Sequence, residues 1–358
     1  MTNYSVFPSP YTVGPEAYRK IPQYCRVYGT KAVVLGGETA ISKAREKLDA
    51  AVAASDIEIL DYIVYGKECT YQAAERAERL PAVRRADMIF AVGGGKAVDT
   101  CKIVGLHLDK PVFTFPTIVS NCAASSALSI VYHEDHSFAE FLHLDEGAKH
   151  VFIDTEIGAQ APEKFLWAGI GDTYAKYYEV SISAKGEKLP HYLALGVHMS
   201  RMCWDTLAEH GAGALRDNIE KIPSYDFEQA ALAIIVTTGY VSMLVAKEHN
   251  MLYNGGVAHA FFYGLCNKPG FDEDHLHGVV VGFGVLILLL IDGQEEEARR
   301  LMAFNRTVGL PVKLSDIGVT LEDVRTYAES MTKDEDLEHY PYRVTADMIV
   351  RAAGQLDV

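Results

Sequence analysis

The chain has 358 residues, of which 49% are apolar and 23% charged, and this composition excludes a disordered or fibrous protein. Lys and Arg total 33 against 48 Asp and Glu, so the net charge of −15 excludes a surface built to bind nucleic acid or an anionic membrane. The length predicts one large or two medium domains.

Short apolar runs alternate with helical patterns over roughly the first 160 residues. The runs predict strands at 31–35, 57–65, 87–92 and 111–115, and the patterns between them predict helices at 42–54, 71–80 and 96–105. This alternation is typical of a parallel sheet covered by helices, so we predict a Rossmann-like α/β domain at residues 1–160.

Helical patterns replace the strands after residue 162. They cover 163–184, 191–209, 226–248 and 278–291. The sequence therefore predicts a second, all-helical domain at residues 161–358.

Several features predict a cytoplasmic protein. The N-terminus lacks the basic start and apolar block of a signal peptide. The longest apolar stretch, at 279–291, is too short to cross a bilayer and predicts a buried core helix. Six scattered cysteines with no CxxC pair are typical of reduced thiols.

Three glycines at 93–95, followed by Lys96 and Asp99, lie between a predicted strand and a predicted helix. Glycines at such a turn allow a ligand to approach the backbone, and the first amides of the helix can then bind phosphate. The alternative is an ordinary tight turn. We favour a pyrophosphate site, because the three glycines occur together with a lysine and a downstream aspartate.

One acid and two histidines in the helical half predict a metal site. Asp172 follows a glycine, His259 lies after a Gly-Gly-Val-Ala run, and His277 precedes the apolar helix. A carboxylate and two imidazoles suit a divalent metal with a position open for a substrate oxygen. The alternative is that each histidine is an ordinary core or surface residue.

A segment rich in small hydroxyl residues, at 115–129, follows the strand at 111–115. Ligands of open parallel sheets bind at the carboxyl ends of the strands, where these hydroxyl groups could contact a nucleotide. The alternative, preferred for this segment alone, is an ordinary Ser/Ala loop.

Together these segments resemble the iron-containing alcohol dehydrogenase superfamily, in its glycerol dehydrogenase branch. The motifs are FAVGGGKAVDTCK, FPTIVSNCAASSALSIVY, AGIGDTYAKYYE, GGVAHAFF and HLHG. The second and third are most similar to hydroxycarboxylate dehydrogenases, which reduce small 2-oxo acids. The resemblance implies a nucleotide-binding domain followed by a helical domain, an active site in the cleft between them, and a homo-oligomer.

The resemblance also implies the site residues. The implied cofactor-binding residues are Gly37, Gly94, Gly95, Lys96, Asp99, Thr117, Ser120, Ser126, Leu128 and Tyr132. The implied metal ligands, and with them the catalytic residues, are Asp172, His259 and His277. Lys176 stands where iron-using members carry a fourth ligand, a histidine, so three ligands remain and we expect one divalent ion, zinc before iron.

Two positions bear on cofactor and substrate. NAD-specific relatives end an early strand with an Asp that bonds the ribose, whereas here Leu35 is followed by Gly36, Gly37 and Glu38. The glycine leaves room for a 2′-phosphate, whereas Glu38 could either replace the Asp or repel that phosphate, so we expect NAD(P) with a slight preference for NADP acceptance. Cys122 stands where glycerol dehydrogenases place an Asp against the polyol, which favours an anionic substrate.

The predicted function is therefore reversible hydride transfer between NAD(P) and a small 2-oxo acid/2-hydroxy acid pair, with no nucleic acid or membrane as partner. The alternatives are a glycerol or other polyol dehydrogenase, a metal- and NAD-dependent lyase similar to dehydroquinate synthase, and an inactive nucleotide-binding protein. Candidates for the proton relay are a metal-bound water, the cofactor's ribose hydroxyl and His275, although we favour a merely structural or solvent-facing His275.

Overall fold

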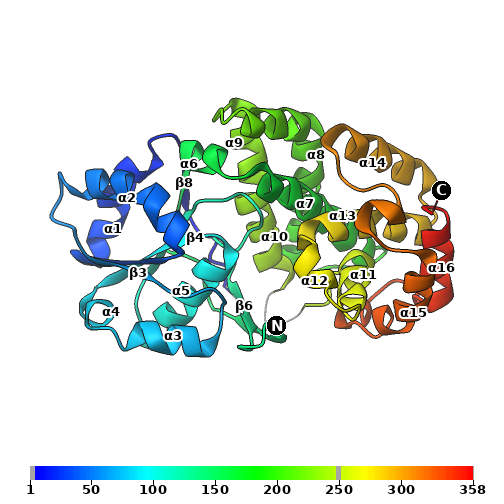
Figure 1. Cartoon of the computed structure of the whole chain (residues 1–358), viewed down its shortest axis with the longest axis horizontal. Coiled ribbons are helices and arrows are strands. Elements are labelled where there is room, and N and C mark those ends of the chain that lie inside the picture. The colour runs from blue at the N-terminus through cyan, green and yellow to red at the C-terminus, as the bar shows by residue number, and fades with distance from the viewer. Residues whose placement is uncertain (1–4, 247–250, 358) are drawn as a thin grey trace. The chain divides into compact units, whose positions relative to one another are not determined.

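The computed structural model describes residues 5–246 and 251–357 of the chain, whose elements are labelled in Figure 1. The chain divides into two compact units, one formed by Met1–Pro162 with Asp217–Met243 and the other by Glu163–Arg216 with Leu244–Val358. Residues 217–243, which the sequence assigns to the helical domain, thus pack within the first unit. The end of the helix predicted at 226–248 lies outside the described residues.

A six-stranded parallel sheet forms the centre of the first unit, in the order β1-β8-β5-β4-β2-β3. Its strands are β1 (Tyr11–Gly14), β2 (Lys31–Gly36), β3 (Glu58–Val64), β4 (Met88–Gly93), β5 (Val112–Pro116) and β8 (His150–Asp154). The predicted α/β class is confirmed, and all four predicted strands are present with ends shifted by at most one residue.

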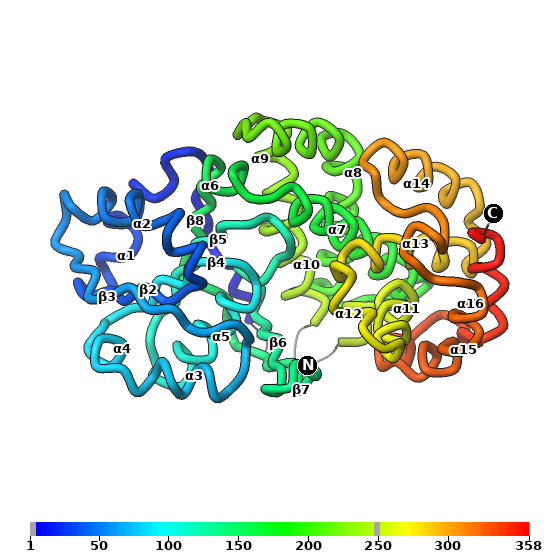
Figure 2. The backbone as a smooth tube through the Cα atoms, viewed as in Figure 1, coloured from blue at the N-terminus to red at the C-terminus, as the bar shows by residue number. Residues whose placement is uncertain are grey.

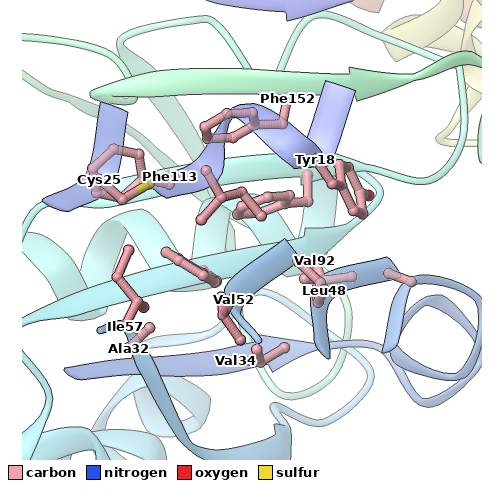
Figure 3. Close-up of a cluster of buried hydrophobic side chains, with 14 of the residues drawn as sticks. Tyr18, Cys25, Ala32, Val34, Leu48, Val52, Ile57, Val92, Phe113 and Phe152 are labelled. Atoms are coloured by element: carbon pink, nitrogen blue, oxygen red, sulfur yellow. The ribbon is translucent and has the colours of Figure 1, made fainter. Parts of the chain in front are cut away.

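Both faces of the sheet are covered by helices, as the alternation of side chains along its strands requires. On β2, Ala32 and Val34 pack into one core, whereas Val33 and Leu35 pack into the other. The first core includes α1 (Ile21–Cys25) and α2 (Glu38–Val52) and is drawn in Figure 3. The helices of the second core are α3 (Tyr71–Glu78), α4 (Pro81–Arg85) and α5 (Gly95–Leu108). Short 3-10 turns η1 (Ala17–Lys20) and η2 (Arg26–Tyr28) flank α1.

Four strands of the first unit are not predicted from the sequence. β1 and β8 are short and pair with each other, and β6 (Leu128–Tyr132) and β7 (Phe138–His143) form a separate antiparallel hairpin. Helix α6 (Thr155–Gln160) follows β8. Polar residues interrupt β1, β6 and β7 at Thr12, Ser129 and Glu140, and the apolar centre of β8 is only three residues long, so none shows the longer apolar run of the predicted β2 and β4.

Residues 225–245 form a continuous helical run made of α9 (Tyr225–Ala231), the π-helical segment η3 (Leu232–Thr237) and α10 (Thr238–Val245). The Ser125 hydroxyl donates a hydrogen bond to the Ile235 carbonyl, and the Tyr240 hydroxyl donates to the Ser9 carbonyl at 2.6 Å. Within the described residues, only this run is long and apolar enough to cross a membrane, but 67% of its most apolar window is buried inside the protein. We therefore describe it as a core helix.

Helices, and no strands, make up the described part of the second unit. They are α7 (Glu163–Ser183), α8 (His191–Ile219), which continues into the first unit, α11 (Val257–Leu265), α12 (Phe271–Asp274), α13 (His277–Ile291), α14 (Glu295–Val308), α15 (Leu321–Met331) and α16 (Ala346–Gly354), with 3-10 turns η5 (Leu314–Ile317) and η6 (Glu335–Leu337). The predicted core helix is confirmed, because α13 is buried from Gly278 to Leu289.

Candidate metal and nucleotide sites

Three helices of the second unit bring the predicted metal ligands together. Asp172 lies in α7, His259 is the third residue of α11, and His277 is the first residue of α13. The backbone trace in Figure 2 shows α7, α13 and α11 as neighbours. Residues separated by 87 and 18 positions in the sequence thus meet at one place.

Glycines allow these helices to pack backbone against backbone. A Cβ atom on Gly171 of α7 would lie 2.1 Å from the carbonyl oxygen of Gly278, and one on Gly278 would lie 2.1 Å from that of Ala168. On the other side of α13, a Cβ on Gly284 would lie 2.7 Å from the carbonyl oxygen of Ala258. Any larger residue at these positions would push the ligand-bearing helices apart.

The geometry of the three side chains fits one divalent cation. One Nε2 or Oδ atom from each lies within 4.8 Å of the others. The Oδ1 atom of Asp172 is 3.7 Å from Nε2 of His259 and 3.5 Å from Nε2 of His277. Two donors at about 2.0–2.1 Å from a tetrahedral ion would lie roughly 3.4 Å apart, so these separations suit a zinc-like cation.

The charges around the cluster favour a cation as well. Burial opposes ionisation of Asp172, but the hydrogen bond from His277 and the charges of His259 and Lys176 outweigh it and hold the pKa of Asp172 below its usual range. Burial also acts to lower the pKa of His259, yet the charges of Glu179, Asp336 and Asp172 raise it to about 9. A positive charge is thus stabilised where the metal would bind.

Two neighbours of the metal cluster are not predicted from the sequence. Glu179, a fully buried acid of α7, contacts Nδ1 of His259 through its carboxylate at 2.6 Å. The ring of Phe262 meets His277 edge to face, with 4.6 Å between ring centroids. Glu179 follows Asp172 by seven residues, about two helical turns, and this spacing is the signal that could have identified it.

Two other residues have purely structural contacts in the structure. Nδ1 of His275 donates to the Phe271 carbonyl at 2.8 Å, and its ring stacks on that of Phe271, as suits the structural role favoured above. Lys176 lies in the same helix as Asp172 and donates hydrogen bonds to the backbone carbonyl and side-chain oxygen of Asn254. Its ammonium group therefore anchors the segment before α11.

The glycine turn of the first unit connects β4 to α5. Gly93 has a φ of +148°, which a side chain would strain, and Gly94 is the N-cap of α5 and contributes no side-chain cap. The carboxyl end of β5 lies beside it, because Gly93 pairs with Pro116 and the Thr117 amide donates to the Gly93 carbonyl at 3.3 Å. The predicted phosphate loop and hydroxyl-rich loop therefore meet at one edge of the sheet.

A side chain at position 94 or 95 would collide with the loop that follows β5. A Cβ on Gly94 would lie 2.5 Å from the Ile118 side chain, and one on Gly95 would lie 2.9 Å from Nδ2 of Asn121. Ser120 lies between these two neighbours and is partly exposed. The glycines thus allow the loop after β5 to lie close against the first turn of α5, where Gly94 and Gly95 are themselves partly exposed.

Lys96 does not extend freely from the turn. Its Nζ atom pairs with the carboxylate of Glu68 at 2.5 Å and lies 5.4 Å from the ring centroid of Tyr132. The same Glu68 oxygen contacts Nδ1 of His136 at 3.0 Å. Burial acts against ionisation of Glu68, but Lys96, His136 and the Cys69 amide hold its pKa below the usual range. Glu68 lies 28 residues before Lys96, so no local sequence pattern predicts this pairing.

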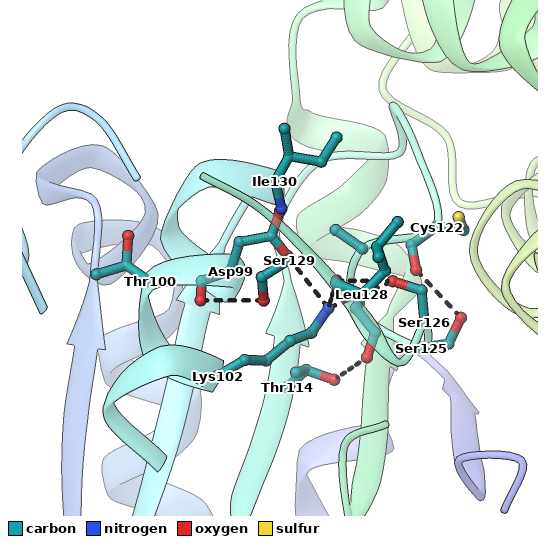
Figure 4. A network of polar contacts seen from close by, with 12 residues as sticks. Asp99, Thr100, Lys102, Thr114, Cys122, Ser125, Ser126, Leu128, Ser129 and Ile130 are labelled. Atoms are coloured by element: carbon teal, nitrogen blue, oxygen red, sulfur yellow. Dashed lines mark hydrogen bonds and ion pairs between the residues drawn. The ribbon is translucent and has the colours of Figure 1, made fainter. Parts of the chain in front are cut away.

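Asp99, Ser126 and Leu128 belong to a buried polar network (Figure 4). Lys102 donates to the Asp99 carboxylate at 3.1 Å, to Oγ of Ser126 at 3.3 Å and to the Leu128 carbonyl at 2.8 Å. Asp99 also accepts from the Ile130 amide at 3.2 Å. Burial raises the pKa of Asp99 despite the nearby ammonium group. The network ties α5 to the start of β6.

The remaining positions singled out in the sequence lie near the carboxyl ends of β2 and β5. A Cβ on Gly36 would lie 2.2 Å from the Val92 carbonyl oxygen, whereas one on Gly37 would approach only Ala40, at 4.0 Å. Glu38 begins α2 and is exposed. Cys122 is partly exposed, and its carbonyl accepts a hydrogen bond from the Ser125 hydroxyl at 3.3 Å.

Comparison with known proteins agrees with these features. A family model described as iron-containing alcohol dehydrogenase matches residues 8–155. A glycerol dehydrogenase of Thermotoga maritima is 34% identical over 306 residues, which cover 82% of this chain and 80% of that protein. Hydroxycarboxylate dehydrogenase A of Escherichia coli is 28% identical, with 90% and 88% covered.

The fold agrees with solved structures too. The crystal structure of glycerol dehydrogenase from Schizosaccharomyces pombe superposes with a TM-score of 0.87 at 22% identity, over 100% of this chain and 91% of that one. Both glycerol dehydrogenases and a hydroxycarboxylate dehydrogenase are among the relatives. The expected particular similarity to hydroxycarboxylate dehydrogenases is therefore not supported. The chain belongs to the iron-containing alcohol dehydrogenase family, in its glycerol dehydrogenase branch, and is an NAD(P)-dependent alcohol dehydrogenase.

Proposed function

We propose that the chain oxidises a small polyol of the glycerol type, and reduces the matching carbonyl compound, with NAD(P) and one divalent cation. The observation that carries this proposal is the cluster of Asp172, His259 and His277 in a chain of this branch. The names of the relatives support glycerol, the alternative of the sequence analysis, better than the 2-oxo acid.

The three clustered side chains would hold the cation. Two imidazole nitrogens and a carboxylate oxygen are donors that zinc accepts readily, and three protein ligands are the usual number at a catalytic zinc. A cation held there acts as a Lewis acid on a substrate oxygen. The carboxylate of Asp172, whose pKa is held low, stays ionised and ready to bind at neutral pH.

We infer that Gly94 and Gly95, with the first amides of α5, hold the pyrophosphate of the cofactor. NAD(P) supplies or accepts the hydride. Thr117, Ser120 and Tyr132 would line the cofactor site from the neighbouring segments, whereas Asp99, Ser126 and Leu128 would act through the buried network. The open space at Gly37 favours acceptance of NADP besides NAD. Lys96 would reach a phosphate only by leaving Glu68.

A 2-oxo acid/2-hydroxy acid pair is the second candidate. It is favoured by Cys122, which by the family resemblance occupies the place of an acid that would face a polyol. Four other cysteines, Cys25, Cys69, Cys101 and Cys203, are buried, whereas Cys122 is partly exposed. A thiol in that place removes a carboxylate that would repel an anionic substrate.

A substrate panel separates the candidates. The full chain is loaded with Zn²⁺ and assayed for NAD(P)H change with glycerol, dihydroxyacetone, 2-oxobutanoate and 2-oxoglutarate, with and without a chelator. We expect chelator-sensitive turnover that is fastest with glycerol and dihydroxyacetone. Turnover of the 2-oxo acids alone would overturn the polyol proposal in favour of the second candidate.

Three further expectations remain predictions. Gly95→Val should block NAD(P)H binding measured by fluorescence, because its side chain would fill the space that the pyrophosphate needs at the start of α5. A homo-oligomer, tested by light scattering, and a cytoplasmic location, tested by cell fractionation, are expected from the family resemblance and the sequence.

A further inference from the structure

Glu179 contacts His259 on the side of the ring away from Asp172, and it lies on the face of α7 that carries Asp172. Its side chain is fully buried, where an ionised carboxylate needs hydrogen-bond donors. Its two oxygens meet two groups of the same residue: Oε1 accepts from the backbone amide of His259 at 3.0 Å, and Oε2 contacts ring Nδ1 at 2.6 Å. One acid thus holds both the backbone and the ring of His259.

The backbone contact fixes where α11 begins. His259 is the third residue of that helix, where amides lack a partner within the helix, and the N-cap is Gly256, which has no side chain to supply one. Glu179 therefore caps α11 from another helix. A Cβ on Gly256 would lie 3.3 Å from Cγ of Glu179, so the glycine allows this close approach.

The ring contact selects the tautomer of His259. An ionised carboxylate only accepts hydrogen bonds, so Nδ1 must carry the hydrogen in this contact. When a metal takes the place of the proton on Nε2, the imidazole keeps a single N–H, at Nδ1, and Nε2 offers its lone pair to the cation. Nε2 lies 3.7 Å from Oδ1 of Asp172, a second donor atom for the same cation.

We propose that Glu179 is the positioning residue of this site: it selects the Nδ1–H tautomer of His259, fixes its ring, and thereby raises the affinity for a divalent cation. This inference rests on the proposed function, because it needs a metal at the three clustered side chains. Glu179 itself touches neither the metal nor the substrate; it acts through His259.

Zinc affinity tests the inference. The metal-stripped full chain and its Glu179→Gln variant are titrated with Zn²⁺ against a chromophoric chelator. A glutamine has one oxygen and one NH₂ group where the carboxylate has two oxygens, so it cannot accept from the amide of His259 at one position and from the ring at the other. We expect Zn²⁺ to bind the variant about 10–100-fold more weakly, the usual effect of losing such a partner.

A matched control lies next to it in the same helix. Tyr178→Phe removes a hydrogen bond of 2.7 Å from a buried tyrosine to Glu297, without touching His259. We expect its Zn²⁺ affinity to equal that of the wild type. Equal affinity of Glu179→Gln and wild type would overturn the inference while leaving the metal site intact, whereas a wild type that binds no Zn²⁺ would overturn the proposed function.

Nitrogen NMR of the wild type supplies a readout that does not depend on the folding of a variant. In zinc-loaded protein labelled with ¹⁵N-histidine, we expect His259 to be protonated at Nδ1 and bound to the metal through Nε2. Binding through Nδ1, or a hydrogen on Nε2, would overturn the inference.

Discussion

Replacing Gly278 by alanine tests how α7 and α13 place the metal ligands. A Cβ at this position would lie 2.1 Å from the carbonyl oxygen of Ala168 and 2.9 Å from Cβ of Asp172. Both atoms are fixed to the backbone of α7 and cannot rotate away, unlike the end of a flexible side chain. The added methyl group therefore acts on the helix as a whole.

The size of the displacement follows from these distances. A carbon–oxygen contact settles at about 3.3 Å, so relieving an approach of 2.1 Å requires the helices to separate by about 1 Å. Metal–ligand distances tolerate only about 0.2 Å. Because His277 is the neighbour of Gly278, the distance between the His277 and Asp172 side chains should change enough for the protein to lose the metal. Overpacking of a core also lowers the free energy of unfolding by about 1–3 kcal/mol.

Bound zinc per chain and the thermal unfolding midpoint measure both effects. The control is Gly354→Ala in α16, where a Cβ would lie 3.8 Å from Cδ2 of Leu321, an ordinary contact. We expect the control to keep its zinc and its unfolding midpoint, while Gly278→Ala loses zinc and unfolds at lower temperature. A Gly278→Ala protein with full zinc content and an unchanged midpoint would refute the argument.

Four other predictions concern charge. Zn²⁺ must displace the proton of His259, whose pKa is about 9, so its apparent affinity should rise with pH up to that value; competition titrations that stay flat would contradict this. Because the ordinary histidine pKa is about 6.5, the metal-free chain should lose stability as pH rises from about 6.5 to 9, as followed by thermal unfolding. Cys122→Asp should lower turnover of any 2-oxo acid and leave glycerol oxidation equal or higher, as kcat/KM for each would show. Lys102→Met leaves Asp99 buried without its ion pair and should cost about 3–5 kcal/mol in urea unfolding, and a loss below 1 kcal/mol would argue against the buried pair.

The sequence predicts those parts of the fold that depend on local pattern. The strands β2, β4 and β5 are mostly apolar runs bounded by glycine, proline or charged residues, and their ends follow from those boundaries. Asp172, His259 and His277 also stand out, because a polar group among glycines and apolar residues is unusual. Their meeting in space is confirmed by the structure.

Contacts between segments that are distant in the sequence could not be predicted from it. The pairing of Lys96 with Glu68 depends on where the segment before α3 lies relative to α5, and no local pattern carries that information. The helical run at 225–245 is recognised as helical, but an apolar helix packs equally well against a sheet or against other helices. Its contacts with Ser9 and Ser125 decide the matter only in three dimensions.

The first unit consists of two separate stretches of chain, and this has a consequence for engineering. The chain passes between the units at 162–163, 216–217 and 243–244, and Asn218 in the returning stretch donates to the Ala159 carbonyl at 2.8 Å. A fragment that stops at residue 162 therefore lacks partners for its own interior, and no single cut yields two complete halves. A chimera that grafts the helical unit of a relative onto this sheet would need three matched junctions, so substrate range is easier to alter by point substitution than by exchange of whole units.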